Sequence, residues 1–282
     1  MIKNRVRYKR LNLKKFLQIL LLITPLANAS KLAIVIDDIG YRNEDNAIYK
    51  MPLEVSVSII PVSPYATERA EKAFAQQRDI LIHQPMQPLS NIRIEDKALK
   101  LGMDKIQIQE IIEYARKRVP YAIGLNNHMG SAATANQQLM NYLMEILANE
   151  QLFFLDSKTN GRSVAEQTAK SFYIPALSRN IFLDDSNELN DVQRQFNSAV
   201  RYAQKNGLAI LIGHPRKNSI KVLKQGIKNL PDDVELVKIS SLWRNEKVKT
   251  PKPLIMFFEM KPAQTSTSNL NNVPLLRGVP KE

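Results

Sequence analysis

Short apolar runs that recur along the chain restrict its fold more than any other feature. Eight of them are five to seven residues long, are rich in Val, Ile, Leu and Phe, and are often apolar at consecutive positions. Such runs are typical of strands that are buried on both faces, as in a parallel sheet. The predicted strands span residues 32–37, 54–60, 79–83, 121–127, 152–156, 180–184, 208–214 and 234–239.

Amphipathic segments fill the gaps between these runs. Residues 187–206 show apolar positions at helical spacing, and Gly207 follows where a left-handed C-terminal cap belongs. Residues 104–118 show a similar face, with Asp104 as the N-cap. Further helices are predicted over 65–77, 134–150 and 218–230. This alternation predicts an α/β fold, and seven or eight mostly parallel strands favour an irregular (β/α) barrel that forms a single domain.

The N-terminal segment has the pattern of a secretory signal peptide. Seven of the 13 excess positive charges lie in residues 1–29, which contain no acidic residue. An apolar run over 16–26 and the sequence Ala27-Asn28-Ala29 follow. The run is shorter than the roughly 20 residues of a membrane span. We therefore expect cleavage after Ala29, an exported periplasmic protein, and no stable membrane span after cleavage; an uncleaved anchor is the alternative.

The rest of the chain divides into a domain and an extension. Residues 30–244 form one continuous series of predicted strands and helices, and 245–282 are polar apart from an apolar island at 254–260. We expect the extension to be disordered and to be the place where an envelope protein partner could bind. The remaining charge excess is spread along the chain, so we expect no nucleic-acid binding.

Two compositional facts exclude whole classes of site. The chain has no Cys, so disulfides, thiolate zinc sites and cysteine nucleophiles are excluded. It has neither a G-x-G-x-x-G sequence nor a P-loop, the usual signals of nucleotide binding. Imidazole chemistry must come from His83, His128 or His214, the three histidines of the protein.

All three histidines stand where a predicted strand ends, and Asp37 and Asp38 stand at the end of the first strand. The carboxyl ends of parallel strands converge on one rim, which is where active sites are built. A single histidine at such a position is more often structural than functional. Because all of them share this position, we predict one shared site.

Metal-assisted hydrolysis is the chemistry that fits these groups. One carboxylate and two imidazoles, with positions left open for water, form a usual catalytic zinc site, and related divalent ions accept it. A second carboxylate could then take a proton from water, and a separate histidine could protonate the leaving nitrogen. Asp37 and Asp38 are adjacent, so in a regular strand they point to opposite faces and reach one site only if the chain bends.

At these residues the chain resembles the divergent polysaccharide deacetylase family (YibQ-like), a branch of the NodB-type carbohydrate deacetylases. The resemblance covers about residues 32–243. It rests on the ordered motifs IDDIG (36–40), LIHQPMQP (81–88), GLNNHMGS (124–131), FFLDSKT (153–159), Arg179 with FLDD (179–185) and IGHP (212–215).

The resemblance implies an irregular (β/α) barrel with a divalent metal ion, zinc, that removes N-acetyl groups from an amino-sugar polymer. By the same resemblance, Asp37 is the catalytic base and His214 the catalytic acid, and Asp38 and His83 bind the metal. We expect Asn127, Asp156 and Arg179 to orient these residues or to contact the substrate.

One motif departs from the family pattern. NodB-type enzymes carry a His-x-x-x-His pair, but Gln87 stands four residues after His83. We expect His128, on the neighbouring strand, to supply the missing metal ligand. NNHMGS also replaces the Arg-and-Pro motif of the main family.

Three functions compete at this point. The first is an exported, metal-dependent N-deacetylase of carbohydrate metabolism that acts on an N-acetylated glycan or another cell-envelope polymer. The second is a catalytically silent glycan-binding or regulatory protein of the envelope that keeps the same barrel. A different hydrolysis, such as phosphodiester cleavage, ranks third, because few Arg and Lys residues stand near the motifs.

Overall fold

The computed structural model describes residues 29–242, and every structural statement below concerns that part of the chain. The signal peptide predicted over residues 1–29 lies outside it except for Ala29. The extension predicted over 245–282 also lies outside it. Both remain predictions.

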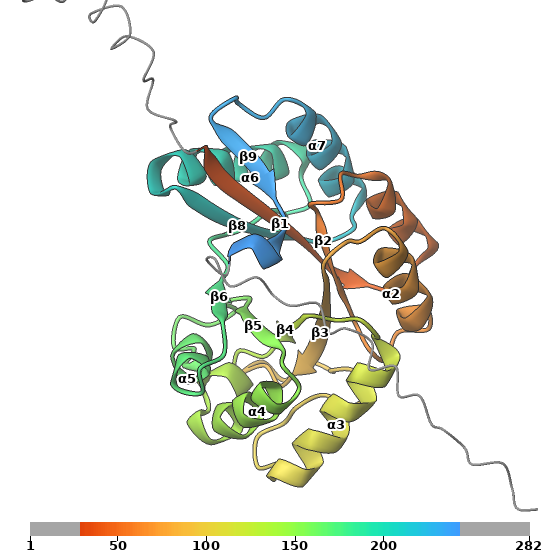
Figure 1. Ribbon diagram of the computed structural model, residues 1–282, viewed down its shortest axis with the longest axis vertical. Helices are drawn as coiled ribbons and strands as arrows, with labels where there is room; N and C mark the ends of the chain where they lie inside the picture. Colours follow the sequence, from red (N-terminus) through yellow and green to blue (C-terminus); the bar gives the residue numbers. More distant parts are fainter. Residues whose placement is uncertain (1–28, 243–282) are drawn as a thin grey trace, which may run out of the picture. The chain divides into compact units, whose positions relative to one another are not determined.

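The core of the described part is one sheet of nine strands, whose pairings are all parallel (Figure 1). The strands are β1 (Ser30–Ile39), β2 (Ser56–Ile59), β3 (Ile80–Met86), β4 (Gly124–Met129), β5 (Phe153–Asp156), β6 (Ala176–Ser178), β7 (Ile181–Phe182), β8 (Leu208–Gly213) and β9 (Val234–Val237). Their order is β6-β5-β4-β3-β2-β1-β8-β7, and β9 also pairs with β1. The α/β class and the parallel sheet are therefore confirmed.

The two edge strands, β6 and β7, follow one another in the chain, and this makes the barrel irregular. Ala176 pairs with β5, whereas Ile181 pairs with β8. Between them, the Arg179 N–H donates to Asp156 O at 3.0 Å and the Asn180 N–H donates to Ile210 O at 2.9 Å. One extended segment thus joins the two edges of the curled sheet.

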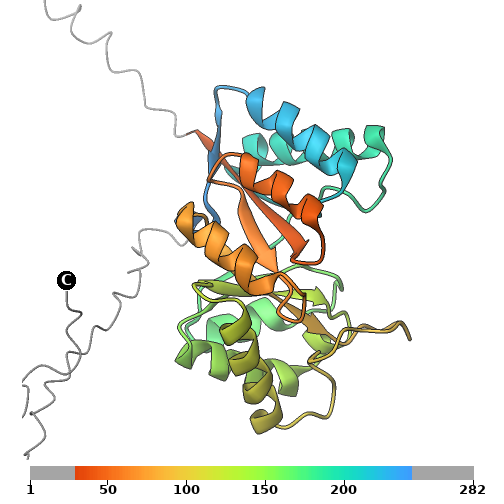
Figure 2. The same cartoon turned by 90° about the vertical axis from the view of Figure 1, so that its right-hand side faces the viewer.

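Helices cover the outer face of this sheet (Figures 1 and 2). The α-helices are α2 (Ala66–Ala75), α3 (Lys105–Arg118), α4 (Gln137–Asn149), α5 (Ala165–Ser171), α6 (Leu189–Asn206) and α7 (Lys217–Lys228). Short 3-10 helices are η2 (Asn43–Lys50), η3 (Ala133–Ala135) and η4 (Ile239–Leu242). Asp104 caps α3 by accepting the Gln107 N–H at 2.8 Å, and Gly207 ends α6 with a φ of +81°, both as predicted.

Two elements of the α/β pattern were not predicted. Strand β6 lacks an apolar run such as the one that predicted the two-residue β7, and helix α5 has only seven residues, too few to show a helical period. The eight predicted strands are all present, and β6 brings the number to nine.

The sheet is buried on both faces, which explains the consecutive apolar residues of the sequence. Alternate residues such as Leu32 and Ile34 pack with the helices, whereas Ala33 and Val35 belong to a second core that contains no α-helical residue. This inner core also includes Leu81, Leu155, Ile210 and Ile212. At the carboxyl ends of the strands, the same inward alternation continues with polar residues. These are Asp37, His83, Asn126, His128, Ser157 and His214.

Candidate metal centre

A backbone irregularity at the end of β1 brings two adjacent carboxylates to one place. Asp38 has a φ of +57°, and the pairing of β1 with β2 shifts register between Ile36 and Ile39. Aspartate tolerates this left-handed conformation better than most residues. The bend that the adjacent carboxylates required is therefore present, and Asp37 and Asp38 both approach His83.

Three ligand atoms from three strands meet in front of this bend. Asp38 Oδ1 lies 3.0 Å from His128 Nδ1 and 3.2 Å from His83 Nε2. The two imidazole nitrogens lie 3.1 Å apart. Zinc ligands about 2.0–2.2 Å from an ion stand roughly 3–3.5 Å from one another. The triangle formed by Asp38, His83 and His128 therefore has the size of one face of a zinc site.

Hydrogen bonds fix which nitrogen of His83 faces this triangle. The amide group of Asn126 donates to both carboxylate oxygens of Asp37, at 2.9 and 3.1 Å. Its amide oxygen therefore points the other way, toward His83 Nδ1 at 2.9 Å. An amide oxygen only accepts, so the His83 proton is on Nδ1 and the Nε2 lone pair is free to bind a metal.

The electrostatics of the triangle suit a cation. Burial alone would raise the pKa of Asp38, but the close contacts and charges of His128 and His83 outweigh it, so this pKa is lowered. Burial lowers the pKa of His128, but Asp38 and Glu95 outweigh it and raise the pKa to about 10. The site thus holds a proton tightly where a divalent ion would bind. Asp38 Oδ1 is buried without a hydrogen-bond partner, which coordination would satisfy.

Asp37 lies on one side of the triangle. Its Oδ2 lies 3.6 Å from His83 Nε2, and the side chain is almost completely buried. Burial raises the pKa of Asp37 despite the opposing effects of His83, His214 and Asn126. A carboxylate with a raised pKa is a better proton acceptor than an ordinary one.

His214 approaches Asp38 from β8. Its Nε2 is 3.7 Å from Asp38 Oδ2, and its Nδ1 is 2.8 Å from Asp184 Oδ1. Asp184 also accepts the backbone N–H of His214 at 2.9 Å and the Ser219 hydroxyl. Burial lowers the pKa of His214, but the Asp184 hydrogen bond and the charges of Asp38, Asp184 and Asp37 outweigh it and raise the pKa. The ring is therefore oriented and charged as a proton donor requires.

Two of the other predicted site residues are directed to neighbouring loops. Asn127 accepts the Ser157 N–H at 2.9 Å and donates to Met129 O at 2.7 Å. Asp156 accepts the Lys158 N–H at 2.8 Å and the Ser163 hydroxyl at 2.7 Å. These contacts connect and order the loops that follow β4 and β5.

Arg179 interacts electrostatically with Asp37. Its guanidinium donates to Ser157 O and stacks on the Phe182 ring, 3.8 Å from the ring centroid. Burial lowers its pKa, while Asp185, Asp156 and Asp37 act in the opposite direction. A positive charge therefore stands within the electrostatic reach of the Asp37 carboxylate.

Three contributing residues were not identified from the sequence. Asn126 had a readable signal, because it is two residues from His128 and so shares a strand face with it. Asp184 lies in the FLDD motif, but nothing in that motif pointed to His214. Glu95, whose carboxylate is 3.4 Å from His128 Nε2, comes from a loop with no pattern at all.

The residue at the position of the second family histidine serves the backbone. The Gln87 side chain accepts the Leu101 N–H at 2.9 Å, and its main chain bonds to Leu99. His128 occupies the triangle, as the sequence led us to expect.

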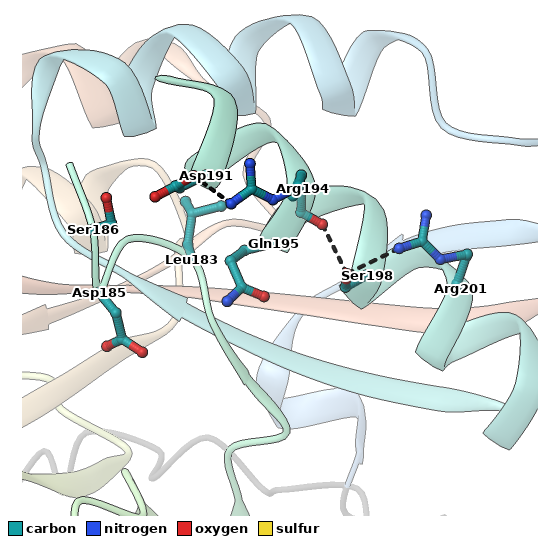
Figure 3. Close-up of a pocket in the computed structure, with 8 residues that line it drawn as sticks. All are labelled: Leu183, Asp185, Ser186, Asp191, Arg194, Gln195, Ser198 and Arg201. Atoms are coloured by element: carbon teal, nitrogen blue, oxygen red, sulfur yellow. Dashed lines mark hydrogen bonds and ion pairs between the residues drawn. The ribbon is translucent and has the colours of Figure 1, made fainter. Parts of the chain in front are cut away.

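A separate hollow of about 300 Å³ lies between the loop after β7 and helix α6 (Figure 3). Asp191 and Arg194 form an ion pair on its wall, and Arg201 donates to the Ser198 hydroxyl at 3.0 Å. None of the three candidate ligands lines it. The chemistry of the triangle is therefore distinct from this hollow.

Comparison with known proteins decides the family. Residues 34–243 match the family described as divergent polysaccharide deacetylase. The chain belongs to this family. Membership confirms the resemblance noted in the sequence and implies an acetylated glycan as substrate.

Full-length relatives support the assignment. An uncharacterised protein of Haemophilus influenzae is 57% identical over 253 residues, which are 89% of this chain and 90% of the relative. The uncharacterised protein YibQ of Escherichia coli K12 is 43% identical, over 86% of this chain and 76% of the relative.

A solved structure shows the same fold. An uncharacterised protein of Agrobacterium tumefaciens C58 has a TM-score of 0.72 at 21% identity, covering 76% of this chain and 89% of that one.

Within residues 29–242, no helix is long and apolar enough to span a bilayer.

Replacing Asp184 with Asn should lower the pKa of His214, because the neutral amide no longer stabilises the protonated imidazole. An NMR titration of the histidines in metal-free protein measures this shift. Asp185→Asn, which removes an exposed charge one residue away, is the matched control and should cause a much smaller shift. Equal shifts in the two variants would show that the Asp184 contact does not set the His214 pKa.

Proposed function

We propose that the protein is an exported, zinc-dependent N-deacetylase of an amino-sugar polysaccharide in the cell envelope. The observation that carries this proposal is the meeting of Asp38, His83 and His128, with Asp37 and His214 next to them. Two nitrogen ligands and one carboxylate oxygen are a usual set for catalytic zinc. Membership of the deacetylase family supplies the reaction class.

Asp38, His83 and His128 would hold the metal ion. A divalent ion bound there supplies polarisation of the acetamide carbonyl and lowers the pKa of a bound water. The remaining steps belong to the protein's own side chains.

Asp37 is placed to accept a proton as the water oxygen bonds to the acetyl carbonyl carbon. Its raised pKa suits this role. His214 is placed to donate a proton to the sugar nitrogen as the C–N bond breaks. The products are acetate and a free amino sugar, and the overall reaction consumes one water molecule. Asp184 keeps the His214 ring oriented throughout.

Exposure of the side chains agrees with a site that is entered from one end. The His83 side chain is 2% exposed, whereas those of His214 and Asp38 are 20% and 34% exposed. The buried groups form a rigid base, and a substrate would approach over Asp38 and His214. A polymer end or an extended chain could reach groups placed in this way.

Metal content tests the first part of the proposal. Purified protein is expected to bind one zinc ion per chain, and His83→Ala and His128→Ala should each lose most of it, because each removes one of three protein ligands. Elemental analysis after dialysis measures the stoichiometry. A wild-type protein that binds no zinc, even after reconstitution, would exclude the proposed site.

Acetate release tests the reaction. Wild-type protein should release acetate from N-acetylglucosamine oligomers or peptidoglycan, and Asp37→Asn should reduce the rate by about 10²–10⁴-fold through loss of the base. The two proteins should bind zinc equally. If both bind zinc and neither releases acetate above background, the catalytically silent glycan-binding protein becomes the better interpretation.

Export is proposed from the sequence of residues 1–29. N-terminal sequencing of protein isolated from the periplasm should begin at Ser30, since cleavage is expected after Ala29. A mature chain that begins at Met1 in the membrane fraction would favour the uncleaved anchor.

A further inference from the structure

We propose that Glu95 is a positioning residue that holds the His128 ring with Nδ1 directed at the metal. The inference rests on the metal site of the proposed function and adds a residue to it. Glu95 lies outside every motif that pointed to the family.

The two nitrogens of His128 face different partners. Nδ1 faces Asp38 Oδ1 and His83 Nε2, at 3.0 and 3.1 Å. Nε2 lies 3.4 Å from Glu95 Oε1, an ion-pair distance, and makes no hydrogen bond within the described residues. A carboxylate only accepts hydrogen bonds, so it favours the tautomer with the proton on Nε2. That tautomer leaves the Nδ1 lone pair directed into the triangle.

The two metal-binding histidines therefore need opposite tautomers. The hydrogen bond to Asn126 places the His83 proton on Nδ1, and the Glu95 carboxylate, 3.4 Å away, favours the His128 proton on Nε2. The rings are nearly perpendicular, with centroids 4.9 Å apart. Because the two imidazoles come from different strands and are nearly perpendicular, each is oriented by a partner of its own, Asn126 for His83 and Glu95 for His128. Such partners of metal-bound histidines typically determine metal affinity.

Within the described residues, Glu95 also interacts with its own backbone N–H and with Tyr41, but its ion pair is with His128. Its Oε2 is buried without a hydrogen-bond partner, and the ion pair recorded for it is the one with His128. Glu95 is not one of the three residues whose ligand atoms meet, so it is not placed as a ligand of the same ion.

Neighbouring contacts explain how a loop residue reaches this place. Gln84 donates to Lys97 O at 2.8 Å, and the main chains of Pro85 and Gln87 bond to Leu99. The Gln87 side chain then accepts the Leu101 N–H. These bonds fasten the end of the loop to β3 a few residues after Glu95. Gln87, where the family pattern has its second histidine, thus helps to fix the loop that carries Glu95.

The test is zinc affinity of the full-length protein, measured by competition with a chromogenic chelator. Glu95→Ala should weaken zinc binding by about 10–100-fold. Glu95→Gln should lose much less, because its amide oxygen can still accept the Nε2 proton. Asp96→Ala and Asp96→Asn remove an exposed carboxylate one residue away and are the matched controls, which should bind zinc as the wild type does.

A long-range ¹H–¹⁵N NMR spectrum of the zinc-loaded wild type provides a second readout that needs no variant. It should show the His128 proton on Nε2 and the His83 proton on Nδ1. A His128 proton on Nδ1 would overturn the proposal, as would a Glu95→Ala variant with wild-type zinc affinity. Equal losses in Glu95→Ala, Glu95→Gln and Asp96→Ala would also overturn it, because they would reflect charge alone.

The outcomes separate this inference from the proposed function. Zinc binding by the wild type with no effect of Glu95→Ala removes only the positioning role. Absence of zinc binding by the wild type removes the metal site itself, and the role of Glu95 with it. If Glu95→Ala fails to fold, the wild-type spectrum and Glu95→Gln still decide.

Discussion

The buried amide of Asn126 is the interaction on which the rest of the site depends. It donates to both oxygens of Asp37 and accepts from His83 and Ser58, and it is itself inaccessible to solvent. Without it, a buried carboxylate would lose its hydrogen-bond donor, and His83 would be free to adopt either tautomer. The neutral Asn126 side chain thus holds the proposed base, Asp37, next to the proposed metal ligand, His83, and gives each a different hydrogen-bonding role.

Burial and partner choice give similar groups different roles. Asp37 and Asp38 are adjacent in the chain, yet the pKa of one is raised and that of the other is lowered. Asp37 is buried and accepts hydrogen bonds from the Asn126 amide, with His83 farther away at 3.6 Å, whereas Asp38 lies within 3.0 and 3.2 Å of two imidazoles. The histidines divide in the same way. His83 is paired with an amide, His128 with Glu95 and His214 with Asp184. The environment, rather than the residue type, separates the proposed metal ligands from the proposed proton carriers.

The fold and the site have a common origin in strand alternation. Inward-facing residues are apolar along most of each strand and polar at its carboxyl end, as in Val35 followed by Asp37 and Ile212 followed by His214. The apolar inward-facing residues pack inside the curled sheet. The polar ones follow them at the carboxyl ends of the strands. Asn127 and Asp156 lie at the alternate strand positions, which do not face inward, and their side chains bond to loops.

The sequence by itself determined the α/β class, eight of the nine strands and the clustering of the histidines at the strand ends, because these follow from local apolar runs and from the convergence of parallel strands. It also indicated His128 as the replacement for the family's second histidine. The three-residue β6 and the seven-residue α5 gave no periodic signal; the pairing with β5 defines β6, and the folded backbone defines α5. Tertiary structure alone decided the left-handed turn at Asp38 and the contacts of Asn126, Asp184 and Glu95. Those contacts join residues 30 to 89 positions apart, and no local pattern encodes such a distance.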